Sequence, residues 1–229
     1  LGAREVHDVC IGLAAMQMFE DVGGVGSLVR DHSAGVAAIA RVLAGTRPQG
    51  VRSAAFLCGL LHDMGKLMLI QCGSYRYELQ DHMPLRAVDE EHLAEQRQLG
   101  FDHAVLGANV IRDWNVPEPV PQVIAWHHRP GRAYAGGGVV AELVALLRLA
   151  DAVDAAMAHD TVLDDATLGW LADAEAAHYL GLDDQAILEC WNPAMAARTE
   201  ALAVFATRRR PPPLTRAKPR KERHVARRR

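Results

Sequence analysis

The sequence predicts an all-α protein, and three observations support this fold class. Apolar side chains recur every three to four residues along most of the chain, which is the period of amphipathic helices. Aromatic residues make up only 5% of a chain that is 50% hydrophobic, a balance unlike that of a β-sandwich or barrel. No segment shows the alternation of a strand, and no internal repeat is present. We therefore expect a bundle of several helices.

Glycine and proline divide the first half of the chain into predicted helices. Apolar residues at helical spacing indicate helices over 3–20 and 27–44, separated by a glycine-rich break at 21–26, with Ser27 as a candidate N-cap. The Gly-Pro-Gly stretch at 45–50 predicts a loop, and residues 51–72 form one strongly apolar helical pattern. Residues 74–100 are polar, and short helices interrupted at Pro84 are expected there.

The second half continues the same pattern. A helix is expected over 102–114, ended by a cluster of prolines (Pro117, Pro119 and Pro121), and a short one over 123–128. Residues 131–138 are glycine-rich and predict a loop. A long apolar helix over 139–158 and further helices over 165–180 and 183–206 complete the predicted bundle.

The formal net charge of −3 conceals two oppositely charged parts. Residues 208–229 carry 11 Lys and Arg against one acid, Glu222, which gives +10 and leaves −13 on the preceding residues. Three consecutive prolines and like charges predict a disordered tail. Such a tail either solubilises the chain or attaches it to a nucleic acid or an anionic membrane surface, although no aromatic residues are interleaved for base stacking.

Cysteine usage and hydropathy indicate a soluble protein of a reducing compartment. The four cysteines lie far apart in apolar stretches, with no metal-binding or redox spacing. No signal peptide is visible, nor an apolar run of about 20 residues that would cross a membrane. We therefore expect a cytoplasmic location.

The pair His62-Asp63 is the first candidate for chemistry. It lies between Leu60-Leu61 and Leu67-Met68-Leu69, where burying ionisable groups is costly unless they have partners. A divalent cation satisfies imidazole and carboxylate together, because both are ligands for borderline metals. Lys66 follows three residues after Asp63, on the same helix face, and would neutralise a carboxylate or an anion. Further candidates fall in other predicted helices: His32, His103, His127, His128 and Asp151.

The order His32, His62-Asp63, Asp151 resembles the HD superfamily of metal-dependent phosphohydrolases. The segments Gly59-Leu-Leu-His-Asp-Met-Gly-Lys66, Asp102-His-Ala-Val-Leu-Gly107 and Ala125-Trp-His-His-Arg-Pro130 are more closely similar to its HDOD subgroup. The resemblance covers about residues 1–160, the predicted core. Residues 161–207 are then helices packed on this core, and 208–229 form the tail.

The resemblance implies a set of ligands. His32, His62, Asp63 and Asp151 match the ligands of the first metal, and Asp63 would bridge to a second metal held by His103, His127 and His128. Neighbours on a helix point about 100° apart, so both His127 and His128 ligate only if the helix ends there, as Pro130 suggests. Asp63 and Lys66 are the candidate catalytic residues, with Lys66 contacting a phosphate or a metal-bound water. Two Fe, Mn, Ni, Co or Zn ions suit such a site.

Two departures from the family pattern bear on function. HDOD proteins usually have a further helical lobe before the point that matches Leu1, so we expect this N-terminal lobe to be missing. The related HD-GYP subgroup, which hydrolyses cyclic di-GMP, has a Gly-Tyr-Pro sequence that does not follow His127-His128 here. Leu28 also offers no carboxylate for a third metal. The sequence therefore does not favour a cyclic di-GMP enzyme.

The resemblance implies a regulatory domain of bacterial signal transduction that retains a metal site and acts through a signalling partner or a small phosphorylated ligand. The alternative is a metal-dependent phosphohydrolase acting on a nucleotide or cyclic nucleotide. The oligomeric state is left open. Six further histidines (His7, His82, His92, His159, His178 and His224) are expected at the surface, the acids at 89–91 on a solvated face, and Trp114 and Trp126 in helix packing.

Overall fold

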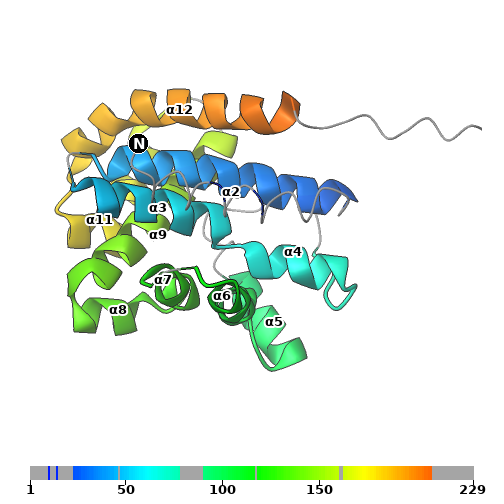
Figure 1. Cartoon of the computed structure of the whole chain (residues 1–229). Helices are drawn as coiled ribbons and strands as arrows, with labels where there is room; N and C mark the ends of the chain where they lie inside the picture. The colour runs from blue at the N-terminus through cyan, green and yellow to red at the C-terminus, as the bar shows by residue number, and fades with distance from the viewer. Residues whose placement is uncertain are drawn as a thin grey trace, which may run out of the picture.

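The computed structural model of the chain describes residues 23–45, 47–77, 90–116, 118–159 and 162–207, together with positions 10 and 14. No strand occurs in these ranges, which confirms the all-α fold class (Figure 1). The helices are α2 (Gly23–Leu43), α3 (Gln49–Leu61), α4 (Met64–Gln71), α5 (Glu91–Leu99), α6 (His103–Asp113), α7 (Val120–Trp126), α8 (Pro130–Gly136), α9 (Gly138–His159), α10 (Asp165–Ala172), α11 (Glu175–Leu180) and α12 (Asp184–Thr207).

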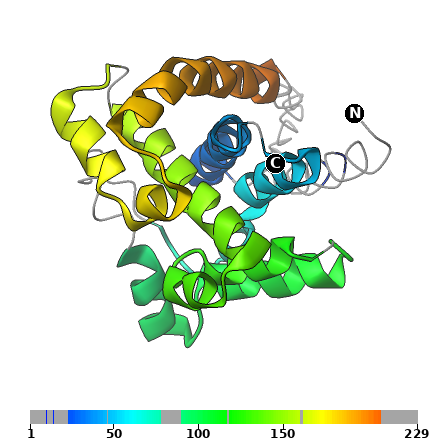
Figure 2. The same cartoon turned by 90° about the vertical axis from the view of Figure 1, so that its left-hand side faces the viewer.

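Helix α2 is the centre of the bundle. It packs against α3, α9 and α12, and Figure 2 shows it nearly end-on with these helices around it. Its residues from Ser33 to Ala40 are all buried, and half of them are alanines. Small side chains let the helix axes approach closely, so the alanine-rich sequence of α2 suits its position inside the bundle.

A second group of helices lies beside this centre. Helix α6 packs against α4 and α7, and α7 and α8 pack against α9; α6, α7 and α8 lie together in the lower part of Figure 1. Helices α10 and α11 pack against α9, and α10 also contacts α12. The junction between α3 and α4, where His62 and Asp63 lie, is therefore the point at which the chain passes from one group of helices to the other.

Several predicted helix boundaries are confirmed. The helix predicted over 102–114 is α6, whose N-cap Asp102 accepts a hydrogen bond from the Val105 N–H at 2.9 Å. The predicted helices over 139–158 and 183–206 are α9 and α12. Apart from positions 10 and 14, the predicted helix over 3–20 lies outside the described residues, as do most of the stretch around Pro84, the basic tail and any N-terminal lobe.

Four predictions about elements are wrong. Ser27 is not an N-cap, because α2 already begins at Gly23; burial of this helix outweighs the low helix propensity of its glycines. The segment 51–72 is two helices, α3 and α4, separated at His62 and Asp63.

The other two errors concern turns. The predicted loop over 131–138 is mostly helix α8, which begins with Pro130, a favourable residue in the first turn. The predicted helix over 165–180 is divided by Asp173 and Ala174 into α10 and α11. Where these helices begin and end is determined by residues at their ends, and the spacing of apolar residues does not reveal such positions.

The apolar stretch Gln49–Gln71 has the length and hydropathy of a membrane span, with a mean hydropathy of 1.3, yet 72% of this window is buried inside the bundle. It is also interrupted by the polar pair at the α3–α4 junction. This stretch is therefore packed mainly inside the bundle.

Candidate metal centre

Close contacts between helices place the pair His62-Asp63. A Cβ atom at Gly59 would lie 2.6 Å from the Ala37 Cα, so the glycine allows α3 to cross α2 tightly. A Cβ at Gly65 would lie 2.0 Å from the His103 backbone oxygen, so this glycine brings the start of α4 against the start of α6. His62 and Asp63 are only 1% and 2% exposed between these crossings.

The first group of candidate ligands surrounds the carboxylate of Asp63. One donor atom each of His32, His62 and Asp63 lies within 4.8 Å of the others. His32 comes from α2, and its Nε2 is 4.0 Å from Asp63 Oδ2 and 3.1 Å from Asp151 Oδ1 on α9. The structure thus brings together all four residues that the sequence assigns to the first metal.

The second group of candidate ligands consists of His103, His127 and His128, whose donor atoms also lie within 4.8 Å of one another. His103 is the first residue of α6, and its Nε2 is 3.2 Å from Asp63 Oδ1. Helix α7 ends at Trp126, so the neighbours His127 and His128 are not held about 100° apart on a helix and both point toward His103. This is the helix end that ligation by both residues was expected to need. Asp63 presents one oxygen to each group, which places it where a bridging ligand would lie.

The imidazole rings are oriented by acceptors on their Nδ1 atoms. His32 Nδ1 lies 2.8 Å from Asp154 Oδ2, and His103 Nδ1 lies 2.8 Å from Glu95 Oε2. His62 Nδ1 and His127 Nδ1 are bonded to the backbone oxygens of Gly59 and Ile124, at 2.8 and 2.6 Å. An acceptor at Nδ1 holds the proton there and leaves the Nε2 lone pair for a metal, the arrangement found around metal-ligating histidines.

Charged side chains complete the surroundings of Asp63. The Lys66 Nζ atom lies 3.0 Å from Asp63 Oδ2 and 3.1 Å from Glu91 Oε2. Glu95 is fully buried and accepts hydrogen bonds from the Tyr77 hydroxyl at 2.7 Å and the His103 backbone N–H at 2.6 Å. His32 and Asp151, with side chains 26% and 22% exposed, lie on the open side of the centre.

The pKa values follow from burial and from these contacts. Burial lowers the pKa of His62, and burial with the neighbouring His128 lowers that of His127 well below its usual range. Burial also opposes charge on His32, but the hydrogen bonds and charges of Asp151 and Asp154 outweigh it and raise the pKa of His32. In the same way burial is outweighed at His103 by Asp63 and Glu95, so its pKa is raised.

The carboxylates shift in the opposite sense. Burial would raise the pKa of Asp63, but the charges of His62 and Lys66 hold it well below its usual range. Burial is likewise outweighed at Asp151, where the hydrogen bond and charge of His32 lower the pKa to about 2. Asp63 and Asp151 are thus ionised at neutral pH, the form in which a carboxylate binds a metal.

The donor set fits a metal ion. The Nε2 atom of His127 is buried without a hydrogen-bond partner, which is costly for an imidazole unless a ligand satisfies it. His103 Nε2 and His128 Nε2 lie 2.9 Å apart. With Nδ1 of His103 facing Glu95, this close approach suits two lone pairs converging on one cation.

The structure also contains partners that the sequence did not suggest. Asp154 and Glu95 hold His32 and His103, and Glu91, which we expected on a solvated face, pairs with Lys66. Asp154 follows Asp151 by three residues on an apolar helix, a spacing that puts both on one face and was a usable signal. Glu95 lies in a polar stretch, where no pattern distinguishes it from solvated acids.

The prediction that His92 lies at the surface is wrong. His92 is 8% exposed, and its ring stacks on that of His128 with centroids 4.5 Å apart. His178 is exposed as expected, while the remaining histidines expected at the surface have side chains outside the described residues. Trp114 and Trp126 are partly buried against the core, as expected for packing residues.

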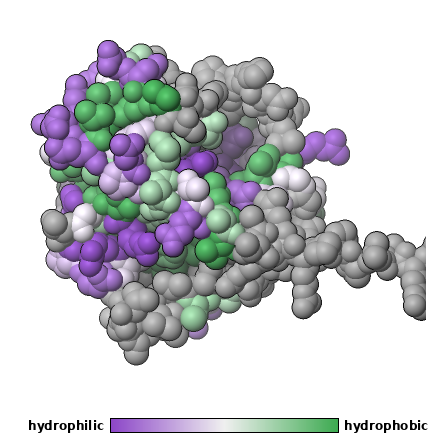
Figure 3. All heavy atoms as spheres, turned by 90° about the horizontal axis from the view of Figure 1, so that it is seen from above, coloured by the Kyte–Doolittle hydropathy of each residue, from purple (hydrophilic) through white to green (hydrophobic). Residues whose placement is uncertain are grey.

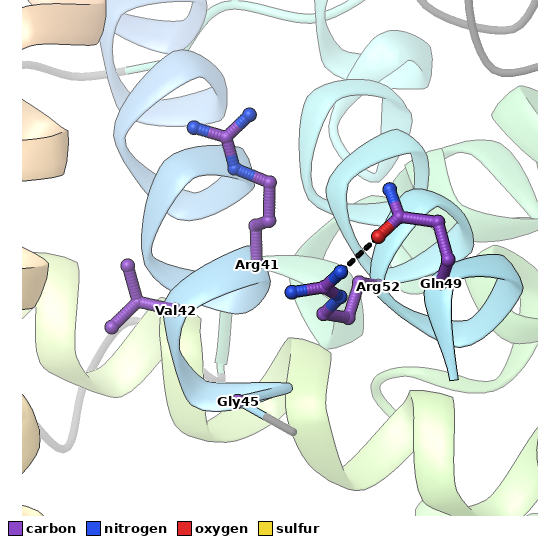
Figure 4. A pocket seen from close by; sticks show the side chains of 5 residues that line it. All are labelled: Arg41, Val42, Gly45, Gln49 and Arg52. Atoms are coloured by element: carbon purple, nitrogen blue, oxygen red, sulfur yellow. Dashed lines mark hydrogen bonds between the residues drawn. The ribbon is translucent and has the colours of Figure 1, made fainter. Parts of the chain in front are cut away.

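A separate pocket of about 410 Å³ lies at the far end of α2, lined by Arg41, Val42, Gly45, Gln49 and Arg52 (Figure 4). Arg52 donates to the side chain of Gln49, which lies three residues before it on the same helix, α3. None of the candidate metal ligands lines this pocket, so it is distinct from the centre around Asp63.

The fold and the centre define a helical bundle of the HD type. The HDOD domain model matches residues 1–130, more than half of the chain, and the chain therefore belongs to the HDOD family. This match includes His32, His62, Asp63, His103, His127 and His128, and it ends before Asp151 and Asp154.

Solved structures of other proteins have the same fold. An HDOD domain protein of unknown function from Geobacter sulfurreducens is 20% identical and gives a TM-score of 0.61, over 88% of this chain and 71% of that one. A protein named "Putative phosphohydrolase" from Shewanella amazonensis SB2B is 22% identical and gives a TM-score of 0.55, over 76% of this chain and 62% of that one. An uncharacterized protein of Treponema pallidum (strain Nichols) is 26% identical over 83 residues, which span 36% of this chain and only 16% of that protein.

Proposed function

We propose that this chain is a regulatory HDOD domain of bacterial signal transduction that binds two divalent cations and acts through a protein partner or a small phosphorylated ligand. One observation carries the metal-binding part of the proposal. Four histidines from different helices and turns each have Nδ1 held by an oxygen; two of these oxygens belong to the buried carboxylates of Asp154 and Glu95, and two to the backbone. Holding the rings in this way costs side-chain entropy, and a cation bound at the Nε2 atoms would offset that cost.

The residues divide the work between two cations. His32, His62, Asp63 and Asp151 would hold the first, and His103, His127 and His128 would hold the second, with the carboxylate of Asp63 facing both. Imidazole and carboxylate donors suit Fe, Mn, Ni, Co or Zn. A cytoplasmic location is part of the proposal, supported by the free state of the described cysteines Cys10, Cys58, Cys72 and Cys190.

Metal analysis of protein purified without chelator tests this function. We expect about two equivalents of a transition metal per chain, and a loss of at least one in His62→Ala and in Asp63→Ala. His178→Ala, at an exposed histidine of α11, is the matched control and should retain the metal of the unsubstituted chain. Sub-stoichiometric metal that is unchanged by His62→Ala and Asp63→Ala would show that the centre is a structural polar cluster.

A second candidate function, metal-dependent phosphohydrolysis of a nucleotide or cyclic nucleotide, is favoured by Lys66. This ammonium group lies 3.0 Å from Asp63 Oδ2, beside both groups of ligands, where it would attract the phosphate of a substrate. Divalent cations bound in such a pair lower the pKa of a water and stabilise charge on a phosphoryl group. Substrate would approach from the side of His32 and Asp151, which is the exposed side of the centre.

A panel of phosphodiesterase and phosphatase substrates separates the two functions. The regulatory function predicts bound metal without turnover. Turnover that disappears in Asp63→Ala, and in Lys66→Met with metal content retained, would establish the phosphohydrolase instead.

A further inference from the structure

The C-terminal helix α12 contacts the candidate metal centre through one side chain. Arg198 reaches from α12 to α9, where its Nε–H donates to Asp154 Oδ1 at 2.7 Å. The other oxygen of the same carboxylate, Oδ2, accepts from His32 Nδ1 at 2.8 Å. Asp154 is 2% exposed and Arg198 is partly buried, so α12 meets α9 at a buried carboxylate.

A glycine provides the space for these contacts. A Cβ atom at Gly35 would lie 2.1 Å from Asp154 Oδ1 and 3.4 Å from the Arg198 Cγ atom. Three helices, α2, α9 and α12, therefore converge on the Asp154 carboxylate. Helix α12 forms one outer face of the molecule, on which hydrophobic residues lie in small groups between hydrophilic ones (Figure 3).

The contacts determine how His32 is held. The terminal torsion of an aspartate is broad, so a carboxylate keeps one rotation only when its oxygens have fixed partners. Arg198 fixes one oxygen and thereby directs the other toward His32. His32 has a side chain that is 26% exposed, so packing alone restrains its ring less than it restrains the buried ring of His62.

Among the described residues, the second group of ligands is not joined to α12 by a side-chain contact of this kind. Its carboxylate, Glu95, is held by the Tyr77 hydroxyl and by the His103 backbone, which lie on other parts of the chain. Any influence of α12 through Arg198 thus falls on the group that contains His32.

We propose that Arg198 is a positioning residue for the candidate metal centre: through Asp154 it orients His32, and it thereby couples the docking of α12 to occupancy of the first cation site. This inference rests on the proposed metal binding. By linkage the coupling is reciprocal, so a cation bound at His32 stabilises the docked position of α12.

Zinc titration of the metal-free full chain by calorimetry tests the proposal. Replacing Arg198 by methionine keeps much of the length and removes the donor. We expect Arg198→Met to weaken one of the two Zn²⁺ sites, by up to the roughly 10–100-fold that loss of a direct partner of a metal ligand costs, and to leave the other unchanged. Arg198→Lys restores a charged donor and should recover part of the affinity. The neighbouring exposed residue gives the control, Thr199→Ala, which should titrate as the unsubstituted chain does.

A double-substitution cycle adds a measure of the contact itself. If Arg198 acts through Asp154, the fold-changes of Arg198→Met and Asp154→Asn should be far from multiplicative in the double variant, because both remove the same support of His32. Independent, multiplicative effects would overturn the proposal.

The unsubstituted chain supplies a readout that does not depend on the folding of variants. We expect amide hydrogen exchange along α12 to slow when Zn²⁺ is added. Two sites in the unsubstituted chain that persist unchanged in Arg198→Met, or exchange in α12 that ignores Zn²⁺, would overturn the coupling while metal binding stands. A chain that binds no Zn²⁺ at all would instead remove the proposed function, and this inference with it.

Discussion

At the scale of single residues, the histidines of the candidate metal centre are defined by which ring nitrogen is free to bind a cation. Four histidine rings have their Nδ1 atoms occupied by an oxygen, so that Nε2 faces Asp63 or its neighbours. The ligand types were predictable from sequence, because histidine and aspartate between leucines are costly without a partner. The carboxylates that hold the histidines were harder to predict. Asp154 was recognisable because it lies one turn from Asp151, whereas Glu95 has no distinguishing pattern around it.

Loss of the charge on Glu95 should weaken metal binding. Glu95→Gln keeps the shape of the side chain but gives His103 Nδ1 a weaker acceptor, and substitutions of this kind typically reduce metal affinity by about 10–100-fold. Calorimetric titration with Zn²⁺ checks this. Glu189→Gln, at an exposed acid that pairs with Gln185, is the control and should have no effect. Equal affinity in Glu95→Gln and in the control would contradict the role of Glu95.

Metal binding should also strengthen as the pH rises. The pKa values of His32 and His103 are raised, so the metal-free chain keeps protons on these rings to a higher pH than an ordinary histidine does. Protons therefore compete with the cation at neutral pH, and the competition ends as the pH passes through the raised pKa values. Titrations in buffers of different ionisation enthalpy should show proton release on binding, and identical heats in all buffers would refute the prediction.

At the scale of helices, the position of the centre depends on where α3 ends and α4 begins. Apolar spacing continues through 51–72, so the sequence pattern predicted one helix and could not reveal the interruption. The interruption arises from tertiary contacts of Gly59 with α2 and of Gly65 with α6, which involve residues far apart in the chain. Helices with a clear N-cap, such as α6 after Asp102, were predictable because the signal is local.

Filling the contact between α4 and α6 should destabilise the fold. A Cβ at Gly65 meets the backbone of His103, which cannot move aside as a side chain can. We expect Gly65→Ala to reduce the free energy of unfolding by about 1–3 kcal/mol, as overpacking usually does. Chemical denaturation measures this change.

Gly169 provides the matched control for this substitution. It lies within α10 with nothing within 4 Å of its added Cβ, so Gly169→Ala should be neutral or raise the unfolding free energy by up to about 1 kcal/mol. If both alanine variants had the same stability, the close approach of α4 and α6 would not be what holds the junction in place.

For the whole molecule, the centre joins helices that are distant in the sequence. Ligands come from α2, from the α3–α4 junction, from α6, from the end of α7 and from α9. A cation there would bind the folded bundle and not the unfolded chain, and would therefore stabilise every one of these contacts together. The all-α class was predictable from helical periodicity, but the mutual placement of these helices was not, because periodicity carries no information about which faces meet.

Removal of metal should lower the stability of the whole bundle. A ligand at about 100 times its dissociation constant stabilises the folded state by about 2.7 kcal/mol. We expect the Tm to fall when chelator is added and to recover with Zn²⁺, and we expect this response to be smaller in His62→Ala, which keeps the ligands of the second cation. Metal analysis before and after chelation shows whether any metal was removed. A Tm that changes neither with chelator nor with Zn²⁺ would then argue against a cation in the bundle.

The oxygens that hold the four histidines are of two kinds, and each cation site would have one of each. Asp154 and Glu95 are side chains, which substitution can remove, whereas the oxygens of Gly59 and Ile124 belong to the main chain and persist whatever residue stands there. Substitutions can therefore change the orientation of His32 and His103, while the backbone continues to hold His62 and His127. Substitution at Asp154 or at Glu95 would therefore change the support of one histidine in one cation site. The other histidine of that site, His62 or His127, would keep its backbone partner.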